Sequence, residues 1–263
     1  MLRKLLKYDL KNIFKFLLIF YGLALFFALL TRIFLSIDNS LIMNVIGQIC
    51  SGVTISMMFN ILINNLMRLW VRFKQNLYGD ESYLTHTLPV EKSTLYLSKI
   101  ITSVITLFTS ISVIALSIFI AYYSKQNLEI LKNILLPVAN AYGSTIIKIL
   151  LAFFFIFFLE FANALQCGFT GLILGHKKNN AKTVYSVLFG FLSYMIIQVF
   201  GLLIIFIVSL FNQELMNLFV TNQMVNIEML KVIIYLAIII YSVAFVIEYL
   251  INVKLFKKGV NVD

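Results

Sequence analysis

The chain has 263 residues and a net charge of +10, and 61% of its residues are hydrophobic while 12% are charged. Soluble domains contain about 45–50% apolar and about 25% charged residues, so this composition excludes a soluble domain and is typical of an integral membrane protein. We expect residues 1–263 to form a single transmembrane domain. The basic residues are spread over short segments between apolar stretches, which favours membrane topology over nucleic-acid binding as the cause of the charge.

The first fifteen residues, MLRKLLKYDLKNIFK, combine apolar residues at helical spacing with lysines between them. An amphipathic helix of this kind lies in the headgroup plane of a bilayer and is attracted to anionic lipid. We therefore predict an interfacial helix over residues 1–15, with membrane lipid as its partner. The same helix is also suited to support a cytoplasmic protein.

Six apolar stretches are long enough to cross the hydrocarbon layer, which takes about 20 helical residues. They cover residues 16–37, 42–66, 98–123, 144–174, 184–211 and 231–253. Most of the 21 Lys and Arg residues lie before the first stretch, after the last, or directly after the second and the fourth. Cytoplasmic segments carry the excess of Lys and Arg, so both termini are predicted to be cytoplasmic. The predicted fold is an all-α, multi-pass bundle of six transmembrane helices.

The second stretch carries polar residues that gather on one side of the predicted helix. Asn44, Gln48 and Ser51 share a face, because residues three or four apart in a helix lie above one another. Such a stripe either lines a translocation path, in which Gln48 takes part, or hydrogen-bonds to neighbouring helices.

Residues 77–93, LYGDESYLTHTLPVEKS, form the longest polar interval, on the predicted cytoplasmic side. Gly79 permits a turn, and Asp80 is placed to cap a short helix over residues 82–87. Pro89 ends this helix, because the residue before a proline is disfavoured in the helical region. The pattern alone leaves open an ordinary polar loop with one helical turn.

The sequence LYGDESYL, followed by TLPV and then LSK, resembles a signature of permease subunits of ATP-binding-cassette exporters of the type-2 family. Ser82 stands where those permeases often have glycine. The basic opening segment and the six apolar stretches are similar to theirs over the whole chain. The resemblance implies a dimer with a second permease copy or a homologous permease. It also implies an N-terminal interfacial helix, a coupling helix between spans two and three, and a re-entrant helical segment before span six.

The resemblance further implies an ATP-driven exporter whose coupling segment, residues 77–90, docks into a groove of a separate ATPase subunit. The chain itself has no G-x-x-x-x-G-K-[ST] phosphate-binding loop. It is therefore expected to be no enzyme and to hold no cofactor, while the partner ATPase binds ATP and Mg. The residues predicted for the ATPase contact are Tyr78, Gly79, Asp80, Glu81, Tyr83, Leu84, His86 and Pro89.

Glu160 lies near the middle of the fourth stretch, where a charge is energetically unfavourable and often functional. It either contacts cargo in a translocation path, with Asn163 and Gln48, or is protonated or hydrogen-bonded to a neighbouring helix. A carrier that couples transport to an ion gradient through Glu160 is the alternative function. Glu248, near the inner end of the last stretch, is expected to pair with Lys254 or a loop lysine.

Smaller patterns in the sequence concern the segment before the last stretch, two glycines and the two cysteines. The segment 212–230 is too apolar for a free loop and predicts one or two short helices in the outer leaflet. Gly171 and Gly175 have the small-xxx-small spacing that indicates close helix packing. Cys50 and Cys167 both lie in apolar stretches and predict buried thiols without a disulfide or a metal site.

The composition is rich in Ile, Asn and Lys and in this resembles low-GC Gram-positive bacteria. Small permeases of this kind in those bacteria often handle amphipathic or antimicrobial peptides. We therefore expect a bacterial cell membrane as the location and such a peptide as the exported cargo, an expectation that rests on analogy rather than on a site.

Overall fold

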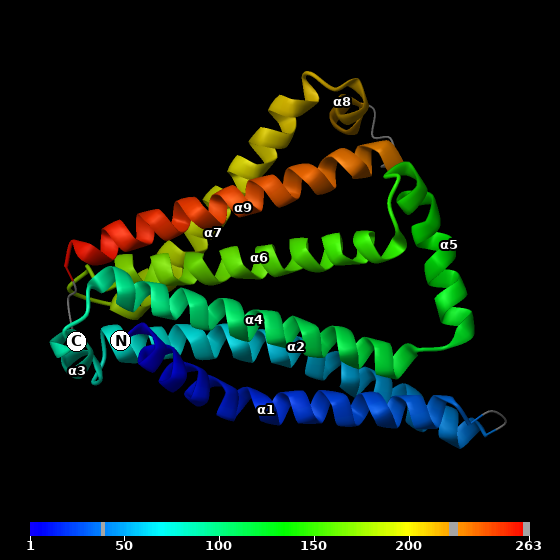
Figure 1. Cartoon of the computed structure of the whole chain (residues 1–263), viewed down its shortest axis with the longest axis horizontal. Coiled ribbons are helices and arrows are strands. Elements are labelled where there is room, and N and C mark those ends of the chain that lie inside the picture. The colour runs from blue at the N-terminus through cyan, green and yellow to red at the C-terminus, as the bar shows by residue number, and fades with distance from the viewer. Residues whose placement is uncertain (38–39, 221–225, 260–263) are drawn as a thin grey trace. The chain divides into compact units, whose positions relative to one another are not determined.

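The structure is a computed structural model that describes residues 1–37, 40–220 and 226–259. All regular secondary structure in these residues is helical, and six helices are long and apolar enough to cross a membrane. The long helices are α1 (Leu2–Leu35), α2 (Leu41–Leu77), α4 (Lys92–Tyr122), α6 (Ile146–Gly175), α7 (Lys182–Ser209) and α9 (Ile227–Lys257) (Figure 1). The shorter helices are α3 (Ser82–Thr87), α5 (Lys125–Ala141) and α8 (Gln213–Val220). The predicted all-α fold with six long apolar helices is confirmed.

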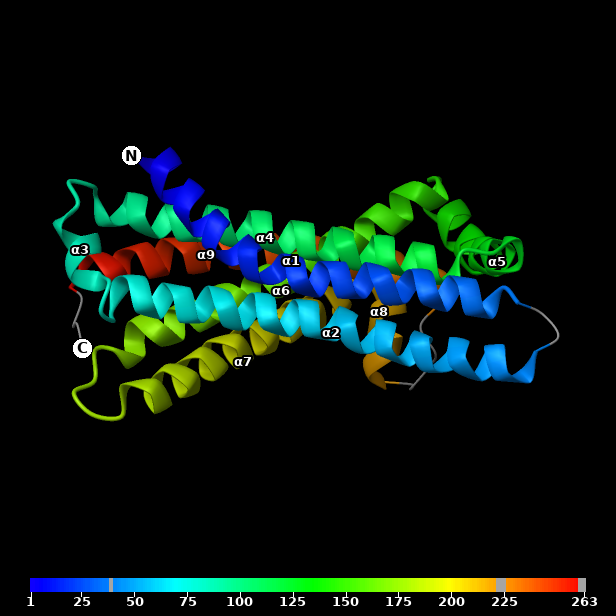
Figure 2. The same ribbon diagram turned by 90° about the horizontal axis from the view of Figure 1, so that it is seen from below.

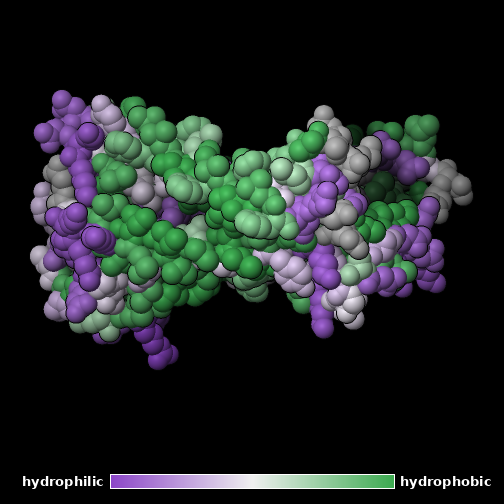
Figure 3. All heavy atoms as spheres, turned by 90° about the horizontal axis from the view of Figure 1, so that it is seen from above, coloured by the Kyte–Doolittle hydropathy of each residue, from purple (hydrophilic) through white to green (hydrophobic). Residues whose placement is uncertain are grey.

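The long helices carry their apolar residues in the middle and their polar residues toward the ends. Figure 3 shows apolar atoms over the central stretches of the helices and hydrophilic atoms gathered toward their ends. This distribution matches a bilayer, in which the hydrocarbon layer meets the middle of each helix and the headgroups meet its ends.

The predicted interfacial segment and the first span are continuous in the structure. α1 runs without a break from Leu2, and its first turns incline away from the rest of the helix in Figure 2. No glycine or proline lies near the expected boundary at Phe16. The buried positions Asp9, Ile13 and Leu17 follow one another at intervals of four residues across that boundary, so one helix face serves both segments.

The chain divides into two compact units, Met1–Glu129 and Ile130–Asp263. In the first unit, α1 packs along both α2 and α4. Polar side chains join these helices: Tyr21 and Ser110 share a hydrogen bond of 2.7 Å, and Ser51 and Tyr122 share one of 2.6 Å. Such bonds hold helices together where no water competes for them. Ser51 of the polar stripe on α2 therefore serves helix packing.

In the second unit, α6 packs against α7 and α9. A Cβ atom added at Gly171 would lie 2.7 Å from the Cα of Gly190, and one added at Gly175 would lie 2.6 Å from the Cα of Ser186. Both distances are far shorter than a van der Waals contact. The close packing predicted from the two α6 glycines is confirmed, and its partner surface is α7.

α5 has no counterpart among the helices predicted from the sequence. This helix contains Pro137, and it packs Leu135 and Ala139 against Ile149 of α6. Proline removes one helical hydrogen bond and disfavours a helix interior, so the local signal was weak. α8 falls within the segment 212–230 for which short helices were predicted, and residues 221–225 of that segment lie outside the described residues.

Candidate functional site

The polar interval between α2 and α4 folds into a compact turn followed by α3. The backbone N–H of Ser82 donates to the carbonyl oxygen of Gly79 at 2.8 Å, and the helix covers the residues for which a short helix was predicted. Its N-cap is Glu81 and not Asp80, and the cap makes no side-chain hydrogen bond. Glu81 forms side-chain bonds elsewhere, and these bonds fix the start of α3 in place of a cap.

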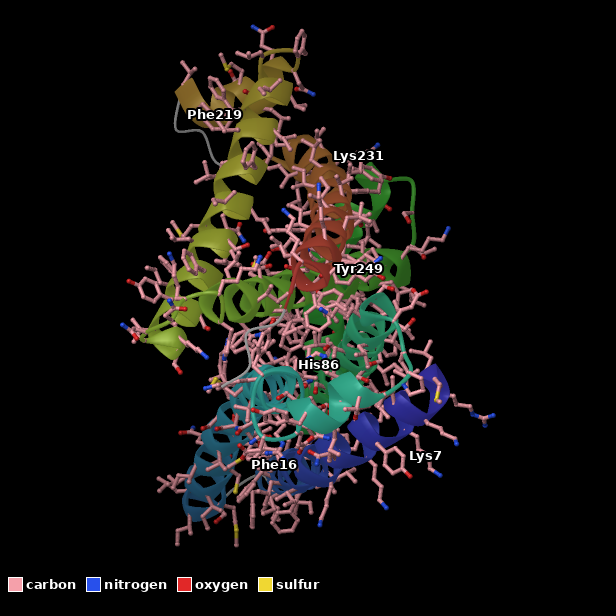
Figure 4. All side chains as sticks on the ribbon, turned by 90° about the vertical axis from the view of Figure 1, so that its left-hand side faces the viewer. Lys7, Phe16, His86, Phe219, Lys231 and Tyr249 are labelled. Atoms are coloured by element: carbon pink, nitrogen blue, oxygen red, sulfur yellow. The ribbon has the colours of Figure 1, made fainter. Side chains whose placement is uncertain are left out.

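Tyr78 anchors the turn from inside the unit. Its side chain is fully buried, and its ring centroid lies 6.3 Å from that of Phe73, which in turn lies 6.1 Å from Tyr96 of α4. Burial raises the pKa of the Tyr78 hydroxyl above its usual value, so this side chain remains neutral. A second anchor is His86, whose Nε2 lies 3.1 Å from the carbonyl oxygen of Leu77 (Figure 4).

A network of charged and amide side chains lies directly behind the turn. Lys99 of α4 donates from Nζ to Oδ2 of Asp9 on α1 at 2.6 Å, and also to Oδ1 of Asn76 on α2. Arg72 of α2 bonds Oδ1 of Asp9 at 3.4 Å through Nε. Through Nη1 it bonds both carboxylate oxygens of Glu81, at 2.8 and 2.9 Å. Asn76 also donates to Glu81. The network thus joins α1, α2, α4 and the start of α3.

Asp9 and Lys99 are buried, whereas the side chain of Glu81 is about half exposed, at 48%. A buried charge is tolerated when it is paired and hydrogen-bonded, as both are here. The network therefore has an interior end, which ties three long helices together, and a surface end at Glu81, which holds α3.

The outer face of α3 presents apolar side chains to the surroundings. Tyr83 is 67% exposed and Leu84 is 75% exposed. Leu88, Pro89 and Asp80 are exposed beside them. Of the eight residues predicted for the ATPase contact, the structure thus separates an exposed set from Tyr78 and His86, which face inward, and Glu81, which is bound to the network.

Sequence reasoning missed the inner residues of this network. Lys99 was noted as a basic residue and as part of the LSK sequence, without an assigned contact, and no role was predicted for Asp9, Arg72 or Asn76. One signal was available for Asp9: it is the only acidic residue in residues 1–37, and it begins the four-residue repeat of buried positions on α1. The partners themselves are separated by 63 and 90 positions from Asp9, so no local pattern identifies them.

The residues predicted for a translocation path lie in both units. Glu160 on α6 accepts hydrogen bonds at Oε1 from the hydroxyl of Tyr194 at 2.6 Å and from Nε2 of Gln198 at 3.1 Å, both on α7. Asn163 donates to the carbonyl oxygens of Leu159 and Tyr241. Glu160 thus has the hydrogen-bonded arrangement that was one of the two interpretations. Gln48 belongs to the first unit, where it is exposed on α2.

The expectation for Glu248 is wrong. Its carboxylate is buried in the second unit, where Oε1 accepts from Sγ of Cys167 at 3.2 Å and from Oγ of Ser193 at 3.1 Å. The residues that the structure describes contain no ion pair of Glu248 with Lys254 or any other lysine. Glu248 lies on the side of α9 that faces α6 and α7. A contact with a lysine at the membrane interface would require a side chain that faces the headgroups.

Both cysteines are buried free thiols, as expected. In the described ranges, no group of three or more His, Cys, Asp or Glu side chains is arranged to hold a metal ion. Comparisons of the chain with protein-family models, with curated proteins and with solved structures give no match.

Proposed function

We propose that this chain is the transmembrane subunit of an ATP-driven exporter and resembles type-2 ATP-binding-cassette permeases in function as well as in its loop signature. In this proposal a separate ATPase subunit binds ATP and Mg, and α3 is the coupling helix on which that subunit acts. The observation that carries the proposal is the combination of an exposed apolar face on α3 with a buried charge network directly behind it.

The exposed face supports a protein contact. Tyr83 and Leu84 lie in a polar connection between two long helices, outside the apolar stretches that meet lipid. Apolar and aromatic side chains at the centre of a polar rim are typical of protein–protein contacts, in which a few residues supply most of the binding free energy. Asp80 and Pro89 would form part of the rim.

The network supports transmission of force. α3 has only six residues, too few to be stable alone, so its position depends on its attachments. Glu81 attaches it to Arg72 and Asn76, and these side chains reach Asp9 and Lys99 on two other helices. A push on α3 therefore acts on α1, α2 and α4 together. In our proposal this is how closure of the ATPase changes the tilt of the membrane helices.

The same family resemblance supports proposals for the ends of the chain, the oligomeric state, the location and the cargo. The first turns of α1, with Lys7 extending away from its neighbours in Figure 4, would lie at the cytoplasmic headgroups. α8 would belong to a re-entrant segment before α9. We propose a dimer with a second copy or a homologous permease, a bacterial cell membrane with both termini cytoplasmic, and an amphipathic or antimicrobial peptide as cargo.

Co-purification tests the proposal. The chain is co-expressed with a candidate ATP-binding-cassette ATPase of the same organism, and the complex is isolated through a tag on the ATPase. We expect Tyr83→Ala with Leu84→Ala to weaken the complex about tenfold or more, because hot-spot truncations typically exceed that effect. Phe211→Ala is the matched control, since Phe211 is 88% exposed on the predicted opposite side of the membrane.

Two results would refute the proposal. One is a complex that forms equally well with the double α3 variant and with the parent chain. The other is transport into vesicles that continues without the ATPase and stops when the ion gradient is removed, which would favour a carrier driven through Glu160.

A further inference from the structure

The second unit buries an acidic side chain that takes no part in the network behind α3. Glu248 on α9 is 5% exposed, and its Oε1 accepts both available donors, the thiol of Cys167 and the hydroxyl of Ser193. Its other oxygen, Oε2, is buried and has no hydrogen-bond partner among the described residues. A buried carboxylate oxygen without a donor is energetically unfavourable, more so in a membrane, unless a bound cation or a proton neutralises it.

A second oxygen of the same kind lies one helical turn further along. Asn252 is 0% exposed, and it directs Nδ2 to the carbonyl oxygen of Gln166 at 3.4 Å. Its Oδ1 is buried and also has no partner in the described part of the chain. Residues four apart share a helix face. The contacts agree: Asn252 reaches Gln166 and Glu248 reaches Cys167, two consecutive residues of α6.

The donors around these oxygens are already used. Cys167, Ser193 and the amide nitrogen of Asn252 all donate to other atoms, so the oxygens left over are acceptors only. Within the described residues, no lysine or arginine pairs with Glu248. Carboxylate, amide and hydroxyl oxygens are the ligands that hard cations prefer. We propose that Glu248 and Asn252, with the hydroxyl of Ser193, bind one monovalent cation such as Na⁺ or K⁺ between α6, α7 and α9.

The charge of the site selects a monovalent ion. Glu248 supplies one negative charge, which one such ion neutralises. The next carboxylate on α6 is Glu160, seven residues before Cys167, which corresponds to a rise of about 10 Å along the helix. Glu160 also has its own donors in Tyr194 and Gln198. A divalent ion would therefore lack the second carboxylate that its charge requires.

Thermal unfolding of the purified full-length chain in detergent tests this site, with NaCl, KCl or choline chloride at equal ionic strength and fixed pH. A ligand that binds only the folded state raises the melting temperature with its concentration. We expect Na⁺ or K⁺ to raise it by about 3–5 °C for each tenfold increase above saturation, relative to choline. Glu248→Gln and Asn252→Leu should each abolish or reduce the ion-specific shift, while Glu160→Gln should keep it.

If Glu248→Gln does not fold, Asn252→Leu still tests the site. Equal melting temperatures in the three salts would overturn the proposal, and so would an ion-specific shift that persists in Asn252→Leu. The same measurement is repeated at a lower pH. A melting temperature that rises equally in all three salts on this acidification would identify a proton as the ligand and would also overturn the proposal. Loss of the shift in Glu160→Gln alone would place the ion elsewhere. None of these results depends on the ATPase, so the cation site and the exporter proposal fail separately.

Discussion

At the scale of single residues, Asp9 has the largest predicted effect on stability. It is the counter-charge of the buried Lys99 and also accepts a bond from Arg72. Removing one partner of a buried pair leaves the other charge buried and uncompensated, which costs about 3–5 kcal/mol. We expect Asp9→Ala to lower the free energy of unfolding in detergent by this amount.

The double variant provides the control for this prediction. Asp9→Ala with Lys99→Met removes both charges, and replacing a buried pair by apolar groups is often nearly neutral. It should therefore recover most of the lost stability. A single variant that unfolds at the same denaturant concentration as the parent would show that Lys99 does not depend on Asp9.

Glu81 should behave in the opposite way. In its pair with Arg72, the side chain of Glu81 is 48% exposed and that of Arg72 is 16% exposed. An ion pair that reaches solvent in this way contributes about 0.2–1 kcal/mol. We expect Glu81→Ala to change the melting temperature little. If the proposed ATPase acts through α3, the same variant should reduce the stimulation of that ATPase by cargo, because α3 loses its connection to the network. Glu129→Ala, an exposed acid on α5, should change neither quantity. Unchanged stimulation in Glu81→Ala would exclude the connecting role of this side chain.

At this scale the sequence predicted a functional segment at residues 77–90. It did not predict that the residues of this segment have separate roles. Tyr78, Glu81 and Tyr83 all appeared as polar or aromatic candidates for one contact. The structure buries Tyr78, binds Glu81 to Arg72 and exposes Tyr83, because the turn at Gly79 directs neighbouring residues to opposite sides. Tyr78 contacts Phe73 and Glu81 bonds Arg72, both on the preceding helix. Arg72 in turn bonds Asp9, 63 positions away along the chain, and a local pattern carries no information about that partner.

At the scale of helices, the contact between α6 and α7 depends on two glycines. We expect Gly171→Ala to destabilise the protein by about 1–3 kcal/mol, because the added Cβ would meet the backbone of Gly190 and force the two helices apart. Gly52→Ala on α2 is the matched control: nothing lies within 4 Å of its added Cβ, and alanine favours the helix. Thermal unfolding of the two variants measures the difference, and equal melting temperatures would contradict the close approach.

Helices were predicted well wherever hydropathy or spacing specified them. The six apolar stretches and the small residues of α6 fall in this class, because the bilayer and close backbone contact each impose a strong local requirement. α5 was missed because Pro137 lies inside it and its apolar side is completed only by Ile149 of α6. The interfacial segment predicted over residues 1–15 and the first span form one continuous helix, because the face buried at Asp9 continues at Ile13 and Leu17.

At the scale of the whole molecule, the charge distribution predicts which ends face the cytoplasm. We expect a membrane-impermeant maleimide to label Phe211→Cys in intact cells and Lys7→Cys only after permeabilisation. The native Cys50 and Cys167 are buried and should remain unlabelled. Labelling of Lys7→Cys in intact cells would reverse the topology and would put α3 on the side that has no ATP.

The central claim is that a separate ATPase acts on this chain through α3, and a photo-crosslinking residue at Leu84 tests it most directly. The chain is co-expressed with a candidate ATP-binding-cassette ATPase of the same organism, and the membranes are irradiated. The crosslinked product is then identified by mass spectrometry. The account predicts a crosslink from Leu84 to the ATPase and none from the control position Phe211. No crosslink from Leu84 in a complex that still hydrolyses ATP in response to cargo would contradict it.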